Sequence, residues 1–271
     1  MSTVMPDLCE FWGFSEAPFA NHTDPRIYFE SRGHEEAQVR LRLAIEKQHA
    51  FTLLTGDFGT GKTLLWNWVA SRLDAGRYVT GQVVNPLLEP VELLREISFC
   101  LGWELKGETK YDVVHGINDL LQRTSSAGRH IVLAIDEAHL IPEARVFEEL
   151  RMLLNYQPDY RPLITVVLLG QTELSEQLKK VPPLAQRLEL KWHLPPLDPD
   201  ETEPYIHHRL REAGGPTDVF DSACYEVIAT ESRGNPREIN RICDLALTAA
   251  AMADSRKIDL ELLQETCRDL N

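Results

Sequence analysis

The sequence predicts an α/β fold in which a five-stranded parallel sheet is sandwiched by helices and followed by a small all-helical domain. Three observations predict it. Short apolar runs alternate with helix-like stretches up to residue 194, the order expected when crossover helices join parallel strands. A proline cluster at residues 195–199 then interrupts the chain. Every later stretch has helical periodicity. We therefore expect an α/β domain over residues 1–197 and a helical domain over residues 198–271.

The expected elements follow in chain order after an aromatic and proline-rich segment within residues 1–34. The run 131–135 is apolar and β-branched, which suits a parallel strand buried on both faces. The expected strands are 51–55, 77–84, 131–135, 163–169 and 189–194. Helices of the first domain are expected at 35–47, 62–73, 90–101, 111–123, 143–155 and 173–179. Those of the second domain are expected at 201–213, 221–232, 236–253 and 259–268.

Composition is that of an ordinary globular protein, with 271 residues, 43% hydrophobic, 26% charged and a net charge of −14. An acidic surface disfavours a broad non-specific grip on nucleic acid or anionic lipid, although a local basic loop could still dock on a partner. No stretch approaches the ~20 apolar residues of a membrane span, and residues 1–10 lack signal-peptide features. The five scattered cysteines have no metal or redox spacing, which indicates reduced thiols and a cytoplasmic protein.

A glycine-rich loop follows the first strand. Residues 56–63 read GDFGTGKT, which fits the phosphate-binding pattern G-x-x-x-x-G-K-[ST] between a strand and a helix. Its glycines let backbone N–H groups face phosphate oxygens, and the helix N-terminus adds a favourable dipole. A glycine turn before an ordinary helix is the alternative, which this strand–loop–helix context disfavours. The expected phosphate-binding residues are Gly56, Asp57, Phe58, Gly59, Thr60, Gly61, Lys62, Thr63 and Leu64. Among them, Lys62 would reach the β- and γ-phosphates and the Thr63 hydroxyl would ligate Mg²⁺.

Two acids follow the third strand. Asp136 and Glu137 come directly after the apolar run 131–135, at the end of a parallel strand where open α/β sheets bind ligands. We expect Asp136 to hold the Mg²⁺ shell and Glu137 to orient or deprotonate an attacking water. The pair could instead simply begin a helix, since acids suit first turns, but the preceding phosphate loop favours the catalytic interpretation. His139 completes the sequence D-E-A-H, and we expect it to be a local helix-start residue.

Several further motifs carry a resemblance to a known family. They are WGFSEAPF at 12–19, DPR at 24–26, LLTG at 53–56, IDEA at 135–138, LRMLLN at 150–155, LGQ at 169–171 and RGNPREIN at 233–240. Together with the predicted pair of domains, they resemble the AAA+ ATPases, and within them the ExeA/GspA branch, over nearly the whole chain. The resemblance implies a P-loop nucleoside triphosphatase with a helical lid and with ATP and Mg²⁺ as cofactors.

The resemblance also implies sensor residues. Gln171 ends the fourth strand, where this class places a polar sensor of the γ-phosphate, although many members have Asn, Ser or Thr there. Arg237 matches the second sensor, which reaches from the lid to the phosphates; a surface arginine at a helix start is the alternative. The aromatic residues of 11–29 could border the adenine or cover a sheet edge, but core packing is the simpler interpretation for most of them.

Two other residues have roles that the resemblance suggests and the sequence leaves open. Arg187 precedes the fifth strand, where the family's arginine finger enters a neighbouring subunit. A solvated surface arginine is the alternative for Arg187, and Arg161 is a rival for the finger. Asn85 ends the second strand and resembles a residue that can hold the catalytic Glu inactive. An ordinary turn residue before Pro86 is the equal alternative.

The implied function is an ATPase that works as a homo-oligomer with an active site at the subunit interface. In the ExeA/GspA interpretation, it drives or signals assembly of a secretion or envelope complex through a membrane-bound protein partner. The sequence ends at residue 271 without the membrane span of such relatives, so we expect a cytoplasmic protein, peripheral to the inner membrane where a partner anchors it. The alternative is an ATP-dependent DNA-binding regulator of the transposition type, which the acidic charge disfavours.

Overall fold

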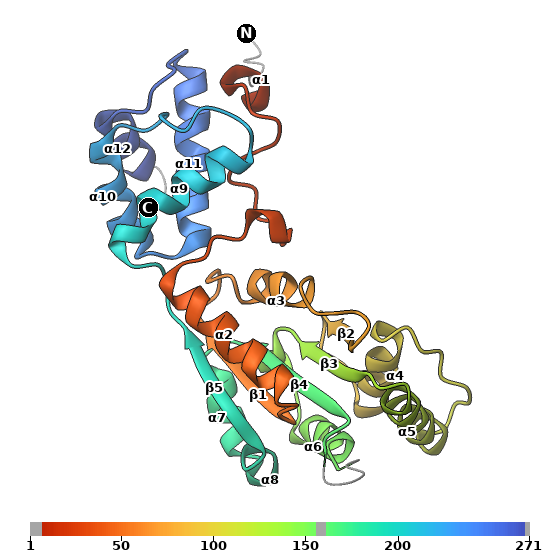
Figure 1. Cartoon of the computed structure of the whole chain (residues 1–271). Helices are drawn as coiled ribbons and strands as arrows, with labels where there is room; N and C mark the ends of the chain where they lie inside the picture. Colours follow the sequence, from red (N-terminus) through yellow and green to blue (C-terminus); the bar gives the residue numbers. More distant parts are fainter. Residues whose placement is uncertain (1–6, 156–160, 269–271) are drawn as a thin grey trace. The chain divides into compact units, whose positions relative to one another are not determined.

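The computed structural model describes residues 7–155 and 161–268 (Figure 1). Contacts divide the chain into two compact units. The sheet unit comprises residues 35–58 and 65–194, and the helical unit comprises residues within 1–34, 59–64 and 195–271. The sequence places residues 1–34 in the α/β domain, whereas in the structure they group by contact with the C-terminal helices.

The sheet has five parallel strands: β1 (Phe51–Gly56), β2 (Tyr78–Val83), β3 (His130–Ile135), β4 (Ile164–Gly170) and β5 (Leu188–Leu194). Their spatial order is β2-β3-β4-β1-β5 (Figure 1). Every residue of β1, β3 and β4 is buried, which explains why these runs are mostly apolar and do not alternate with charged residues. The predicted fold class is confirmed. Because all five strands are parallel, their carboxyl ends share one edge of the sheet.

Helices flank this sheet: α2 (Arg32–Glu46), α3 (Lys62–Ala70), α4 (Pro90–Cys100), α5 (Lys110–Ser126), α6 (Ala144–Leu153), α7 (Glu173–Lys179) and α8 (Pro182–Ala185). The short 3-10 helix η2 (Ala138–Leu140) follows β3. Apolar side chains of α4, α5 and α6 form one core with β3 and β4. This core fixes the positions of the strand ends, from which the polar residues of the candidate site project.

The helical unit has its own core. Its elements are α1 (Leu8–Trp12), η1 (Pro25–Ile27), η4 (Pro199–Glu201), α9 (Thr202–Glu212), α10 (Ser222–Ser232), α11 (Pro236–Met252) and α12 (Leu260–Arg268). Trp12, Phe14 and Phe19 of the N-terminal segment are buried in this core. The Trp12 indole N–H also donates to the Leu247 carbonyl at 3.2 Å. These three aromatic side chains therefore pack the helical unit.

No helix within the described ranges combines the length and the apolar character needed to cross a membrane.

Candidate active site

The phosphate loop joins β1 to α3. Gly59 and Gly61 have φ angles of +87° and +94°, in the left-handed region that glycine adopts at little cost. Helix α3 begins at Lys62, whose side chain is only 7% exposed. A buried cationic side chain at a helix N-terminus, beside a loop turned by two glycines, suits the binding of a phosphate chain.

The loop closely approaches the start of α11 within the helical unit. A Cβ atom on Gly59 would lie 2.6 Å from Asn235 Oδ1 and 2.7 Å from Arg237 Cβ, so neither leaves room for a side chain at residue 59. Asn235 caps α11 by accepting the Arg237 backbone N–H at 3.0 Å. The structure thus brings Arg237, the predicted second sensor, against the phosphate loop. Its side chain is exposed.

The two acids lie at the carboxyl end of β3. Asp136 is 4% exposed. Its carboxylate accepts the Gln82 amide at 3.3 Å and the Glu137 backbone N–H at 2.9 Å. Glu137 has φ +47° and ψ +35°, a conformation that is uncommon for a residue with a side chain. This turn separates the two carboxylates: Asp136 stays buried, while Glu137 is 34% exposed.

Gln171 lies at the end of β4, which is the strand between β3 and β1 in the sheet. It is therefore placed between the end of the strand that carries the acids and the end of the strand that leads into the phosphate loop. This is the place at which the family resemblance implies a polar sensor. Its sensing role stays a prediction.

His139 lies between two of the predicted site residues. It does lie in η2, as a helix-start residue would, but its ring also contacts both neighbours. Nδ1 lies 3.4 Å from Glu137 Oε2 and 3.3 Å from the Gln171 backbone N, and Nε2 lies 3.1 Å from the Gln171 side-chain Nε2. The Gln177 amide donates to the His139 carbonyl at 2.8 Å. His139 therefore links Glu137 to Gln171. The only sequence signal was its place two residues after Glu137.

Arg187 lies at the opposite edge of the sheet, just before the amino end of β5. Its guanidinium donates to Asn155 through Nη2, and its buried Nη1 has no hydrogen-bond partner among the described residues. Arg161 precedes β4 at the same edge and is exposed. Neither arginine meets Glu137 within one sheet unit, because the amino and carboxyl ends of parallel strands lie at opposite edges.

Asn85 follows β2 and is exposed. Its Oδ1 accepts the Leu87 backbone N–H at 3.1 Å, which is an Asx turn before Pro86. Asn85 and Glu137 both belong to the described part of the chain, and no hydrogen bond joins them. The turn alternative thus has direct geometric support, and a role for Asn85 in restraining Glu137 stays a prediction.

The donor set suits a magnesium nucleotide. Mg²⁺ prefers oxygen ligands and is usually held by one or two protein groups together with substrate phosphates and water. The buried Asp136 carboxylate and the Thr63 hydroxyl at the start of α3 are oxygen groups of that kind. That they hold one ion together stays a prediction. The left-handed glycines of the loop and the buried Lys62 suit the phosphates that would share the ion.

Comparison with known proteins agrees with this geometry. Residues 45–178 match a family described as an AAA domain. Over 256 residues the chain is 36% identical to General secretion pathway protein A of Aeromonas hydrophila, a match that covers 92% of this chain and 46% of that protein. The chain therefore spans about half the length of this relative.

Among solved structures, the ORC2 protein of Aeropyrum pernix has a TM-score of 0.72 at 16% identity, covering 94% of this chain and 72% of that one. The RuvB Holliday junction branch migration motor of Thermotoga maritima has a TM-score of 0.61 at 23% identity, covering 88% of this chain and 68% of that one. At these identities the likeness concerns the fold alone.

Proposed function

Because the chain belongs to the AAA+ ATPases and is a relative of General secretion pathway protein A, we propose that it binds ATP with Mg²⁺ and hydrolyses it at a subunit interface. The hydrolysis drives or signals assembly of a secretion or envelope complex, through a protein partner at the membrane. The observation that carries the nucleotide part is the phosphate loop, with its two left-handed glycines and the buried Lys62. The choice of ATP over GTP rests on the family to which the chain belongs.

Each residue then has a chemical task. The loop amides and Lys62 bind the phosphates, and Arg237 reaches them from the helical unit. Thr63 and Asp136 hold Mg²⁺, which when bound neutralises part of the charge on the β- and γ-phosphates. Glu137 orients the attacking water and accepts its proton. Gln171 contacts the γ-phosphate side of the site, and His139 fixes Glu137 and Gln171 relative to each other.

In the proposed oligomer, a neighbouring subunit contributes an arginine finger to the active site. We assign it to Arg187 of a neighbouring copy, with Arg161 as the rival. A finger supplied in trans contributes about 10³–10⁵ in rate. For Arg187 to act, its bond to Asn155 must open, so docking of the neighbour would have to compensate for the loss of that bond. A dilute monomer is therefore a slow ATPase.

The experiment that tests this function is the ATPase rate per subunit against protein concentration, for the wild type and Glu137→Gln, with and without duplex DNA. We expect a rate that rises with concentration, vanishes in Glu137→Gln and ignores DNA. Mixing Glu137→Gln with Arg187→Ala subunits should restore activity at interfaces that combine an intact Glu137 with an intact Arg187. Stimulation by DNA that falls steeply with salt would replace this proposal with the transposition-type regulator.

A further inference from the structure

The first turn of α2 carries a buried histidine that the site described so far does not use. His34 is 5% exposed. It belongs by contact to the helical unit, as do the loop residues 59–64. Histidine is seldom fully buried without hydrogen-bond partners, because desolvation of its ring nitrogens is costly. The ring of His34 has partners on both sides.

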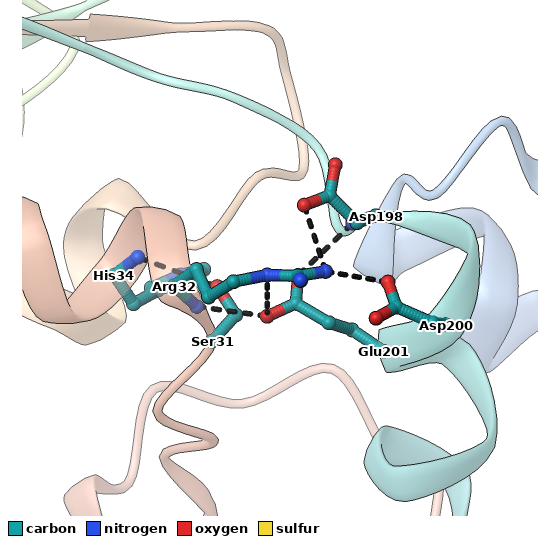
Figure 2. Close-up of polar contacts among 6 residues, drawn as sticks. All are labelled: Ser31, Arg32, His34, Asp198, Asp200 and Glu201. Atoms are coloured by element: carbon teal, nitrogen blue, oxygen red, sulfur yellow. Dashed lines mark hydrogen bonds and ion pairs between the residues drawn. The ribbon is translucent and has the colours of Figure 1, made fainter.

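One partner is Ser31. Its Oγ lies 2.7 Å from His34 Nδ1 and also accepts the His34 backbone N–H at 3.3 Å (Figure 2). The other partner is the phosphate loop, where the ring makes a hydrogen bond with the Thr60 backbone. A Cβ atom on Gly61 would lie 2.9 Å from His34 Nε2. The ring thus fills the space that a side chain at residue 61 would need.

These contacts define the protonation of the ring. Burial lowers the pKa of His34 to about 4, and the Thr60 hydrogen bond raises it in part. A hydrogen bond that favours the charged imidazole is one that the ring donates, so the acceptor is the Thr60 carbonyl and the donor is Nε2–H. Nδ1 is then bare and accepts the Ser31 hydroxyl. A neutral His34 therefore satisfies both ring nitrogens at once.

The turn that carries His34 is itself anchored. The guanidinium of Arg32 lies among the carboxylates of Asp198, Asp200 and Glu201 (Figure 2). The Arg32 backbone N–H donates to Glu201 Oε1 at 2.8 Å, while Oε2 of the same carboxylate accepts the Asp198 backbone N–H at 3.0 Å. These bonds fix the start of α2 to η4, at the entry to the C-terminal helices.

We propose that His34 is a positioning residue for the phosphate loop: it holds the Thr60–Gly61 backbone in the conformation that receives the phosphates of a nucleoside triphosphate. Ser31 sets the tautomer of the ring, and Arg32 fixes the turn from which the ring projects. The inference rests on the proposed nucleotide-binding function and adds to it a residue outside every motif of the sequence analysis.

Three substitutions separate the hydrogen bond from mere packing. His34→Leu keeps an apolar filling but loses both bonds. His34→Gln can place an amide N–H near the position of Nε2 and so keeps the bond to Thr60. His34→Asn is too short for that bond and reaches only Ser31. The matched control is His130→Leu, because His130 is also 5% exposed and bonds a hydroxyl, Thr165 Oγ1, at 2.8 Å. It lies at the amino end of β3, the edge opposite the one where β1 enters the loop.

We would measure the dissociation constant of ATP-Mg²⁺ by calorimetry, together with the unfolding midpoint of each nucleotide-free variant. The expected result is about tenfold weaker binding for His34→Leu and His34→Asn, the size of one lost hydrogen bond. We expect His34→Gln to stay within about threefold of the wild type, and His130→Leu to lose stability without losing affinity.

The inference is overturned if the wild type binds ATP and His34→Leu binds it equally well. It is also overturned if His130→Leu loses as much affinity as His34→Leu. Should His34→Leu fail to fold, the comparison of Gln with Asn decides, and equal affinities for these two would refute the inference. A wild type that binds no nucleoside triphosphate would instead refute the proposed function itself.

Discussion

Nδ1 of His139 has two neighbours that it cannot bond at the same time. To accept the Gln171 backbone N–H at 3.3 Å, the nitrogen must be bare, whereas to donate to Glu137 at 3.4 Å it must carry the proton. The side-chain amide of Gln171 at the other ring nitrogen, Nε2, favours one tautomer or the other according to its orientation. The orientation of the Gln171 side-chain amide therefore affects, through the tautomer of His139, whether the ring can donate to the Glu137 carboxylate.

Substitution of His139 should affect turnover more than binding. In His139→Ala the Glu137 carboxylate and Gln171 lose their shared contact, so we expect kcat to fall roughly tenfold, a part of the 10²–10⁴ that a positioned general base contributes. The dissociation constant of ATP should change less than about twofold. Steady-state ATPase kinetics together with calorimetry test this, with Glu137→Gln as the inactive reference. A rise in kcat would show that the contact restrains Glu137 instead.

At this scale the sequence predicts the residues whose chemistry is encoded in short motifs. Lys62, Asp136 and Gln171 each follow a strand-like run, so their edge of the sheet could be anticipated. His139 and His34 could not be anticipated in the same way. Their contacts depend on backbone atoms of Gln171 and Thr60, which lie 32 and 26 residues away along the chain, and no motif records such an approach.

At the scale of elements, the start of α11 and the phosphate loop constrain each other. Gly59→Ala should therefore impair more than the loop alone. The new Cβ would face Asn235 Oδ1 and Arg237 Cβ within 3 Å, at a φ of +87° that alanine resists. We expect about 1–3 kcal/mol lower stability and a large loss of ATP affinity. Chemical denaturation and calorimetry measure the two effects.

The control for Gly59→Ala is Arg237→Ala, which removes the guanidinium but keeps the Cβ and the Asn235 cap. We expect its unfolding free energy to stay within about 0.5 kcal/mol of the wild type, because the side chain is exposed. If Gly59→Ala were as stable as the wild type and bound ATP normally, the close approach of α11 to the loop would contribute neither to stability nor to ATP binding.

The order of strands and helices could be predicted because apolar runs and proline clusters mark each element locally. Boundaries differ by a few residues: the second strand was expected at 77–84 and is found at Tyr78–Val83. The grouping of the N-terminal aromatic segment was not predictable. Aromatic content indicates burial but not which core receives it, and Trp12 finds its carbonyl acceptor 235 residues away, on Leu247.

At the scale of the whole molecule, two buried histidines make stability depend on pH. Burial lowers the pKa of both His34 and His130 to about 4, whereas a histidine in the unfolded chain titrates near 6.5. Between these values the unfolded chain binds more protons than the folded one, so stability rises with pH in this window and is lost as pH falls through it. Four carboxylates have a lowered pKa: Asp24, Asp112, Glu176 and Asp218. Their protonation lowers the free energy of unfolding further only below about pH 4.5.

The resulting prediction is a drop in unfolding free energy between pH 7.5 and pH 5.5. Each histidine should lower the free energy of unfolding by up to about 1.4 kcal/mol, which is the free-energy equivalent of one pKa unit. Asp244, whose pKa burial raises, opposes the trend, whereas His208, whose pKa burial also lowers, adds to it. Urea denaturation at both pH values measures the drop, and both lie above the isoelectric point of about 5.1. In the double variant His34→Gln, His130→Gln the pH slope should flatten, because no buried imidazole remains at these positions to take up a proton on unfolding. A slope that persists in this variant would assign the loss of stability to other groups.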